Sequence, residues 1–301
     1  KFGDKKLVAA LGLFLPWICR LKRIPTIVLL HNIVERVDLT RAGFTSSNLM
    51  QFLYNGIGKV ITRLILKADL VALTMPEYVT LIQQKYNVNN MVLVPHGSFE
   101  TLEALPQNPQ NTGLKVMAFG KFGTYKKVET MIEAVVHVRE ITGLSIEIVI
   151  AGTDNPNALG YLEGVKNKYN SIPQLTFTGY VKEEDVSRVF IESTLVVFPY
   201  LTTTGSSGVL SQVGSYGKAV VMPHIGDLAR LVEKEGYQGL FFEPDSVPSL
   251  ASAIEKLITD EALRDQIANA NFNAAKSFPM DRVTAIYLDH FSALMAKRKG
   301  L

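Results

Sequence analysis

Short apolar runs alternate with stretches of helical periodicity along most of the chain. This alternation predicts parallel strands joined by helical crossovers, which is an α/β architecture. In the C-terminal half, the expected strands span residues 115–119, 145–151, 175–178, 195–198, 219–222 and 239–242. The helices expected between and after them span 128–141, 157–169, 183–192, 209–216, 228–235, 247–259, 261–277 and 280–298. Six strands with five crossovers form a complete doubly wound domain.

The N-terminal part has the same pattern but fewer elements. Strands are expected at 25–30, 70–73 and 91–95, and helices at 47–67 and 76–86. A complete domain of this type would need about three more strand–helix units, so the domain is unusually small or truncated. Residue 1 is Lys and not Met, which favours truncation. The predicted organisation is a partial domain (1–101), a linker rich in Pro, Asn and Gln (102–112), a full domain (113–277) and a returning amphipathic helix (278–301).

Charge and cysteine content exclude several classes of function. The net charge of +3 is too small to indicate nucleic-acid binding, but residues 1–100 hold twelve Lys and Arg against six Asp and Glu. That basic half suits anionic partners such as phosphate groups or an anionic membrane face. The single cysteine, Cys19, excludes an internal disulfide and favours a reducing cytoplasm. The histidine spacing predicts no zinc site.

Two N-terminal segments bear on membrane contact. Residues 7–19 are apolar throughout, which is too short for the roughly 20 residues that a spanning helix needs. We expect a buried helix there, with membrane-surface contact as the alternative. The helix at 52–67 carries Lys59, Arg63 and Lys67 at four-residue steps, which fits acidic lipid head groups or a solvated face equally.

Two glycine-containing segments follow strands of the C-terminal domain. The first reads Gly-Lys-Phe-Gly-Thr-Tyr-Lys-Lys over 120–127, and its lysines lie at the carboxyl edge of the sheet, where α/β proteins bind ligands. A solvated loop is the alternative. The second, Thr-Thr-Thr-Gly-Ser-Ser-Gly-Val over 202–209, precedes a helix whose free N–H groups would bind phosphate. Capping by Ser206 or Ser207 is the alternative there.

These motifs resemble those of the family-4, group-1 glycosyltransferases. The family's G-R-L-x-x-x-K-G segment is similar to residues 120–127, and its block from E-G-F-G to G-x-P-V-V is similar to 204–221. The strand ends at His31 and at 95–97 also look like those of the family's N-terminal domain. The resemblance implies a GT-B-like fold: two Rossmann-like domains facing across a cleft, the N-terminal one incomplete.

The resemblance also implies a set of site residues. His31 and Lys126 fall on catalytic positions, and the donor-binding positions are Lys121, Lys126, Val181, Thr204, Gly205, Ser206, Ser207, Gly208, Val209 and Gln212. His96 and His224 also end strands and are secondary candidates. Two family glutamates fall on Thr204 and Gln212, and a family arginine falls on Lys121. Gln212 can still accept hydrogen bonds, Thr204 cannot replace a charge, and Lys121 loses bidentate geometry.

The implied function is retaining, metal-independent glycosyl transfer from a nucleotide-diphosphate sugar, with no cofactor. A saccharide or lipid-linked molecule would be the acceptor, and nucleic acid is not an expected partner. The implied location is the cytoplasm, or its inner membrane face through peripheral contact with anionic lipid. A non-catalytic nucleotide-sugar-binding protein or partner subunit is the alternative, because Thr204 and Gln212 replace the glutamates. A nucleotide-sugar epimerase of the same fold is a third reading.

Overall fold

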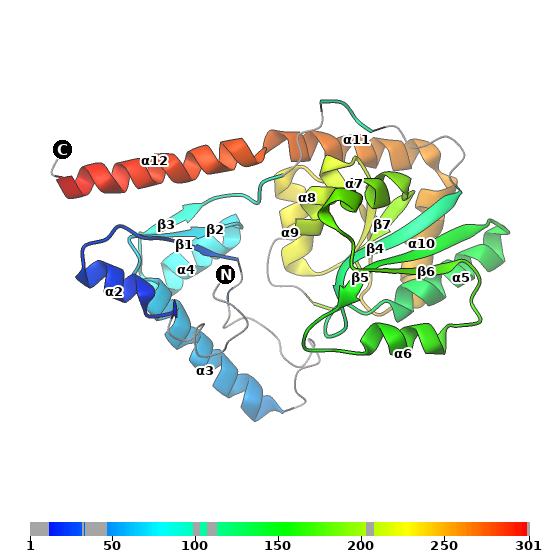
Figure 1. The fold of residues 1–301 in the computed structure, drawn as a ribbon, viewed down its shortest axis with the longest axis horizontal. Coiled ribbons are helices and arrows are strands. Elements are labelled where there is room, and N and C mark those ends of the chain that lie inside the picture. The colour runs from blue at the N-terminus through cyan, green and yellow to red at the C-terminus, as the bar shows by residue number, and fades with distance from the viewer. Residues whose placement is uncertain are drawn as a thin grey trace.

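The chain folds into two α/β units joined through residues 94–113 (Figure 1). The computed structural model describes residues 12–31, 33, 47–98, 103–106, 113–202 and 208–299. The described N-terminal unit contains a parallel sheet in the order β1-β2-β3. Its elements are α2 (Leu15–Leu21), β1 (Ile27–Leu30), α3 (Asn48–Ile65), β2 (Leu70–Leu73), α4 (Pro76–Tyr86) and β3 (Met91–Leu93).

The C-terminal unit contains a six-stranded parallel sheet in the order β6-β5-β4-β7-β8-β9. Its strands are β4 (Leu114–Phe122), β5 (Ile146–Asp154), β6 (Leu175–Gly179), β7 (Leu195–Val197), β8 (Ala219–Pro223) and β9 (Leu240–Phe242). Its helices are α5 (Glu129–Thr142), α6 (Tyr161–Lys168), α7 (Glu183–Glu192), α8 (Gly208–Ser215), α9 (Gly226–Glu235), α10 (Val247–Thr259) and α11 (Glu261–Ser277). The six predicted strands and the doubly wound α/β class are confirmed.

Strand alternation places two apolar layers on opposite faces of the larger sheet. Val116 and Ala118 of β4 belong to a buried cluster with α5 and α10, whereas Met117 belongs to a second cluster with α7, α8 and α9. Successive side chains of a strand point to opposite faces, which produces this division. The second cluster also includes Leu30, Val71 and Tyr78. The core on that face therefore runs on into the N-terminal unit.

N-capping side chains fix the starts of α10 and α11. Ser246 Oγ accepts from the Ser249 N–H at 3.3 Å before α10, and Asp260 Oδ1 accepts from the Leu263 N–H at 2.9 Å before α11. Each side chain satisfies an N–H group that has no partner within its helix. These starts agree with the predicted ones because the capping signal lies in the sequence itself.

The last helix, α12 (Met280–Lys299), runs back along the N-terminal unit (Figure 1). Val283 packs with Ala72 of β2 and with Val94. Near the far end of the helix, Arg298 donates to Asp69 at 2.9 Å. The helix thereby joins the end of the chain to the first unit, although the predicted domain boundaries themselves stay predictions.

Three sequence expectations require correction. The predicted loop at 120–127 begins later, because β4 continues to Phe122 and pairs with β5 as far as Asp154. The helix predicted from residue 157 begins only at Tyr161, after Gly160 adopts a left-handed conformation.

The helix expected to be buried within 7–19 is α2, and among its described side chains only Pro16 is buried. It packs beside α3 and leaves most of its apolar side chains at the surface; residues 1–11 lie outside the described residues.

Candidate functional site

The larger sheet has one topological switch point, between β4 and β7. The chain proceeds from β4 toward β5 and β6 on one side, and from β7 toward β8 and β9 on the other. Ligands of open α/β sheets bind at the carboxyl ends of such neighbouring strands. The segments that leave β4 and β7 here are linked by backbone hydrogen bonds: Lys127 donates to Pro199 at 3.0 Å, and Leu201 donates to Tyr125 at 2.8 Å.

Lys126 lies at this junction and carries a stable positive charge. Its Nζ atom is 4.3 Å from the Tyr200 ring centroid and 5.8 Å from that of Tyr125. Burial disfavours its charged form, but attraction to Tyr200 and Tyr125 outweighs this and raises the pKa of Lys126 above its ordinary value. The ammonium also lies beside Gly120, since a Cβ at that position would be 3.3 Å from Nζ.

The other predicted donor-binding positions divide into described and undescribed ones. Lys121 is exposed within β4, in register with Thr153 of β5. At the start of α8, Gly208 is exposed and Val209 is half-buried. The remaining positions of this segment, Thr204, Gly205, Ser206 and Ser207, lie outside the described residues.

A cavity of about 360 Å³ lies between α7 and α8, and its lining contains both Val181 and Gln212. Its volume is within the usual range for small-molecule sites. The residues that complete its lining are Tyr180, Glu183, Val186, Ser211, Ser215 and Tyr216. The structure thus brings together two predicted donor-binding residues that are far apart in the sequence.

Some lining residues outside the predicted donor-binding set were still indicated by the sequence. Ser211 and Ser215 are four residues apart, so they share one face of α8 beside Gln212. Tyr180 follows β6 directly and is 78% exposed, which is unusual for an aromatic side chain. Helical spacing from Gln212 would have found the serines. The family resemblance already places a nucleobase contact near Tyr180 and Val181.

The N-terminal unit contacts α8 through the segment that follows β3. Ser211 Oγ donates to the Gly97 carbonyl oxygen at 3.1 Å, and the Ser98 and Ser215 hydroxyls hydrogen-bond each other. Gly214, on the same helix, is required for packing on α11, because a Cβ there would be 2.7 Å from Ala275 Cβ. α8 is therefore held from both sides, which fixes the wall of the cavity.

Two histidines of the N-terminal unit lie together near the start of α8. The ring centroids of His31 and His96 are 6.2 Å apart. His96 also lies next to Gly208, because a Cβ on that glycine would be 3.6 Å from His96 Cε1. Partial burial, and secondarily the neighbouring His96, lower the pKa of His31. The His31 ring is therefore neutral at neutral pH.

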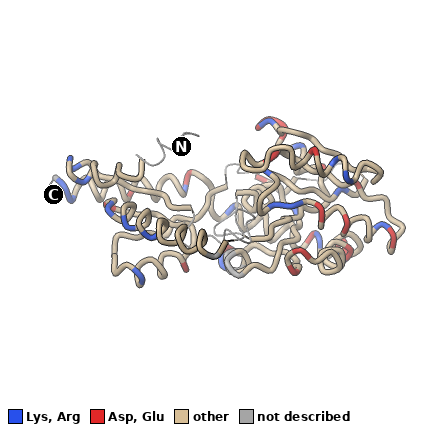
Figure 2. The backbone as a smooth tube through the Cα atoms, turned by 90° about the horizontal axis from the view of Figure 1, so that it is seen from below, with Lys and Arg blue, Asp and Glu red and all other residues tan. Residues whose placement is uncertain are grey.

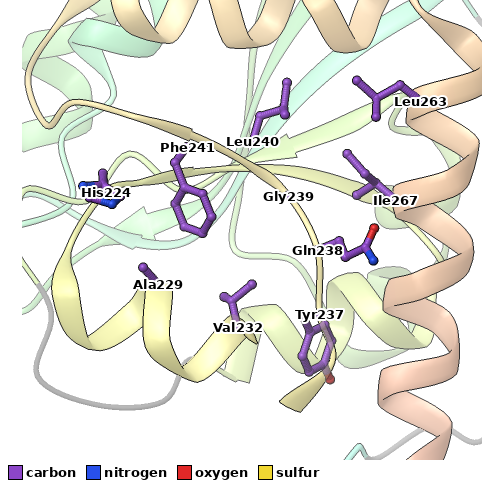
Figure 3. A pocket seen from close by; sticks show the side chains of 10 residues that line it. All are labelled: His224, Ala229, Val232, Tyr237, Gln238, Gly239, Leu240, Phe241, Leu263 and Ile267. Atoms are coloured by element: carbon purple, nitrogen blue, oxygen red, sulfur yellow. The ribbon is translucent and has the colours of Figure 1, made fainter. Parts of the chain in front are cut away.

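His224 lies elsewhere, in a larger cavity of about 540 Å³ formed by α9, β9 and α11 (Figure 3). Its ring centroid is 5.9 Å from that of Phe241. The other lining side chains are mainly apolar, with Val232, Leu263 and Ile267 among them. This cavity offers little to hold a diphosphate and shares no lining residue with the cavity at Gln212.

The C-terminal unit, which carries this site, is similar to a known family of domains. Residues 113–260 match the family model described as "Glycosyl transferases group 1". These residues form a group 1 glycosyltransferase domain. The resemblance inferred from the motifs is thus confirmed. The region includes the junction at Lys126 and the cavity at Gln212.

Individual relatives agree with this glycosyltransferase domain. The chain is 29% identical over 178 residues to alpha-D-kanosaminyltransferase of Streptomyces kanamyceticus, covering 57% of the chain and 45% of that protein. It is 26% identical over 174 residues to the serotype-specific mannosyltransferase WbdA of Escherichia coli, covering 56% of the chain and 21% of WbdA. The chain therefore matches less than half of the length of either relative.

Solved structures extend the similarity to the N-terminal unit. Anabaena HepE, solved in complex with UDP-glucose, superposes with a TM-score of 0.72 at 16% identity, covering 96% of this chain and 77% of HepE. Similarity at that identity concerns the fold. The chain has the GT-B fold, with two Rossmann-like units, as the resemblance implied.

Proposed function

We propose that the protein transfers a sugar from a nucleotide-diphosphate sugar, with retention of configuration, to a saccharide or lipid-linked acceptor. The observation that carries the proposal is the position of Lys126. Its ammonium is held over the Tyr200 ring at the switch point of a group 1 glycosyltransferase domain. A fixed positive charge there would stabilise the negative charge that develops on the departing diphosphate.

The cavity at Gln212 suits the nucleoside part of such a donor. Tyr180 offers an exposed ring for contact with the base, while Gln212 and Glu183 offer hydrogen-bonding groups for the base and ribose. With the diphosphate at Lys126, the sugar would extend toward the cleft side that His31 and His96 occupy. The N-terminal unit would then supply the acceptor side.

A direct test combines binding with turnover. UDP-, GDP- and ADP-sugars would be titrated calorimetrically, and release of nucleoside diphosphate would then be followed with candidate saccharide and lipid-linked acceptors. We expect saturable binding of one nucleotide class and transfer with the anomeric configuration of the donor retained. Inversion of configuration in the product would refute the retaining mechanism.

Metal independence is part of the proposal, since Lys126 and the start of α8 would supply the positive charge. Metal-stripped enzyme assayed in EDTA is therefore expected to transfer sugar at the rate of the untreated enzyme, within about twofold. Restoration of lost activity by Mg²⁺ or Mn²⁺ would contradict this. Donor binding measured in parallel shows whether a loss arises in the binding step or in transfer. No organic cofactor is proposed.

A second function, nucleotide-sugar binding without catalysis, is favoured by one observation. Gln212 lines the cavity at a position where the family resemblance places a glutamate. A neutral amide accepts hydrogen bonds from ribose hydroxyls less strongly than a carboxylate does. Binding of a donor with no transfer to any acceptor would support this second function over the first.

Substitution of Gln212 by glutamate tests its role in donor binding. We expect Gln212→Glu to bind the nucleoside diphosphate about fivefold to tenfold more tightly, because a charged acceptor strengthens hydrogen bonds to ribose hydroxyls. Calorimetric titration measures the change. Gln238→Glu, at an exposed position in the other cavity, is the control and should leave the affinity unchanged. Weaker binding by Gln212→Glu would place the ribose elsewhere.

Substitution of His31 tests the acceptor side. We expect His31→Ala to lower kcat by about 10- to 100-fold while donor affinity changes by less than about threefold, because the residue lies on the N-terminal unit. His137→Ala is the matched control, since His137 is an exposed histidine on α5. An unchanged kcat would remove His31 from the reaction.

The proposed location is the cytoplasm, with peripheral contact at an anionic inner membrane face. Described residues 12–31 and 47–67 contain six Lys and Arg and no Asp or Glu. Within the described part of the chain, no helix is long and apolar enough to cross a bilayer. An anionic surface would attract this basic region toward a lipid-linked acceptor.

A further inference from the structure

The outer face of α3 is apolar although it faces solvent. Leu49, Leu53, Ile57 and Val60 recur at helical spacing and are 67%, 50%, 59% and 54% exposed. On the opposite side of the helix, residues such as Ile65 pack into the core. A helix that is apolar on both sides is normally covered on both sides. Contiguous exposed apolar surface of this kind marks an interaction site.

The neighbouring helix α2 enlarges this apolar surface. It packs against α3 (Figure 1), and Leu15, Trp17 and Leu21 are 45%, 48% and 64% exposed. We call the combined surface the α2–α3 face, and its exposed apolar residues are Phe14, Leu15, Trp17, Ile18, Leu21, Leu49, Met50, Phe52, Leu53, Ile57 and Val60.

The cations of these helices have no acidic neighbours in the described segments 12–31 and 47–67. Lys59 and Arg63 are exposed and four residues apart, so they lie on one side of α3 beside its apolar stripe, and Lys67 is exposed just beyond the end of the helix. Arg20 and Lys22 are exposed at the end of α2. Figure 2 shows Lys and Arg around the N-terminal unit, whereas Asp and Glu gather mainly on the C-terminal one.

We propose that the α2–α3 face docks onto an anionic lipid bilayer, with its apolar side chains inserted at the head-group boundary. Helices that combine an apolar face with exposed aromatics and cations lie in the membrane interface. The exposed cations of the described segments 12–31 and 47–67 are complementary to anionic head groups. The inference extends the acceptor side of the proposed function and rests on it only for the identity of a lipid-linked acceptor. Vesicle binding itself requires no glycosyl transfer.

Trp17 provides a direct probe, because it is the single tryptophan of the chain and lies on the α2–α3 face. The protein would be mixed with phosphatidylcholine vesicles with and without phosphatidylglycerol, and binding measured by co-sedimentation. We expect binding to the anionic vesicles, a blue shift of the Trp17 emission, and protection of Trp17 from acrylamide. Binding without a change at Trp17 would assign the contact to another surface and overturn the proposal.

Matched variants separate the apolar and the electrostatic contributions. Leu53→Ser is expected to weaken vesicle binding about tenfold, and Leu159→Ser, at an 81% exposed leucine of the C-terminal unit, should leave it unchanged. Lys59→Glu with Lys67→Glu should weaken binding at least about 25-fold. Lys166→Glu with Lys256→Glu makes the same change in net charge on exposed residues of the C-terminal unit and is the control.

The remaining outcomes are equally decisive. Absence of vesicle binding by the folded parent would overturn the proposal, even if donor binding and transfer are intact. Concentration-dependent self-association that Leu53→Ser abolishes, without vesicle binding, would assign the face to a second copy of the chain and also overturn it. Loss of transfer with retained vesicle binding would refute the proposed enzyme activity and leave the membrane contact standing.

Discussion

Replacement of Lys126 by alanine is expected to lower the rate of sugar transfer by about 100- to 1,000-fold. The substitution removes the positive charge that lies 4.3 Å from the Tyr200 ring centroid at the switch point of the sheet. Affinity for the nucleoside diphosphate should fall by roughly 10- to 100-fold, the range for loss of a hydrogen bond between charged groups. Calorimetry and a product-release assay measure the two effects separately.

The adjacent lysine supplies the control for this experiment. Lys127 is exposed, and its backbone N–H donates to Pro199, a bond that an alanine retains. Lys127→Ala should therefore change both quantities by less than about threefold. Lys126→Arg keeps the charge but changes its geometry, so it should recover part of the activity. Equal donor binding by Lys126→Ala and the parent would remove Lys126 from the diphosphate site.

Replacement of Gly152 by alanine is expected to destabilise the C-terminal unit by more than about 3 kcal/mol. Gly152 has a φ of +145°, and a Cβ there would be 1.8 Å from the Gly120 carbonyl oxygen. The two glycines are register partners where β4 and β5 approach the site. The strands would have to separate, and Gly120 would move relative to Lys126. Urea unfolding followed by circular dichroism measures the loss.

Gly164 provides the matched glycine control. It lies within α6, and a Cβ there would meet nothing within 4 Å. Gly164→Ala should stabilise the protein by up to about 1 kcal/mol, since alanine favours the helical backbone. If Gly152→Ala unfolded at the parent's urea concentration, the close approach of β4 and β5 would be refuted.

The candidate site was partly predictable because some of its residues directly follow a strand or begin a helix. Lys126 follows a strand, and Gly208 and Val209 start a helix, so the sequence alone places them at the carboxyl edge of a parallel sheet. The fit of Gln212 to a cavity depends instead on how α7 and α8 pack. Tyr180 reaches the same cavity from the end of β6, whereas Ser215 reaches it from α8. Spacing along the chain relates Ser215 to Gln212 within α8, but it does not show that Tyr180 meets that helix.

By itself, the sequence determined the order and type of the elements. Apolar periodicity and capping residues act over a few positions, and for this reason the observed starts of α10 and α11 agree with the predicted starts at 247 and 261. The family motifs on 115–258 likewise depend only on residue order.

The tertiary structure alone decided which distant residues meet and which apolar side chains stay uncovered. Ser98 and Ser215 hydrogen-bond across 117 positions, and His96 reaches the start of α8 from the other unit. The apolar segment expected to be buried instead contributes Trp17 to the exposed α2–α3 face. Burial depends on what packs against a helix, and the composition of the helix does not specify its neighbours.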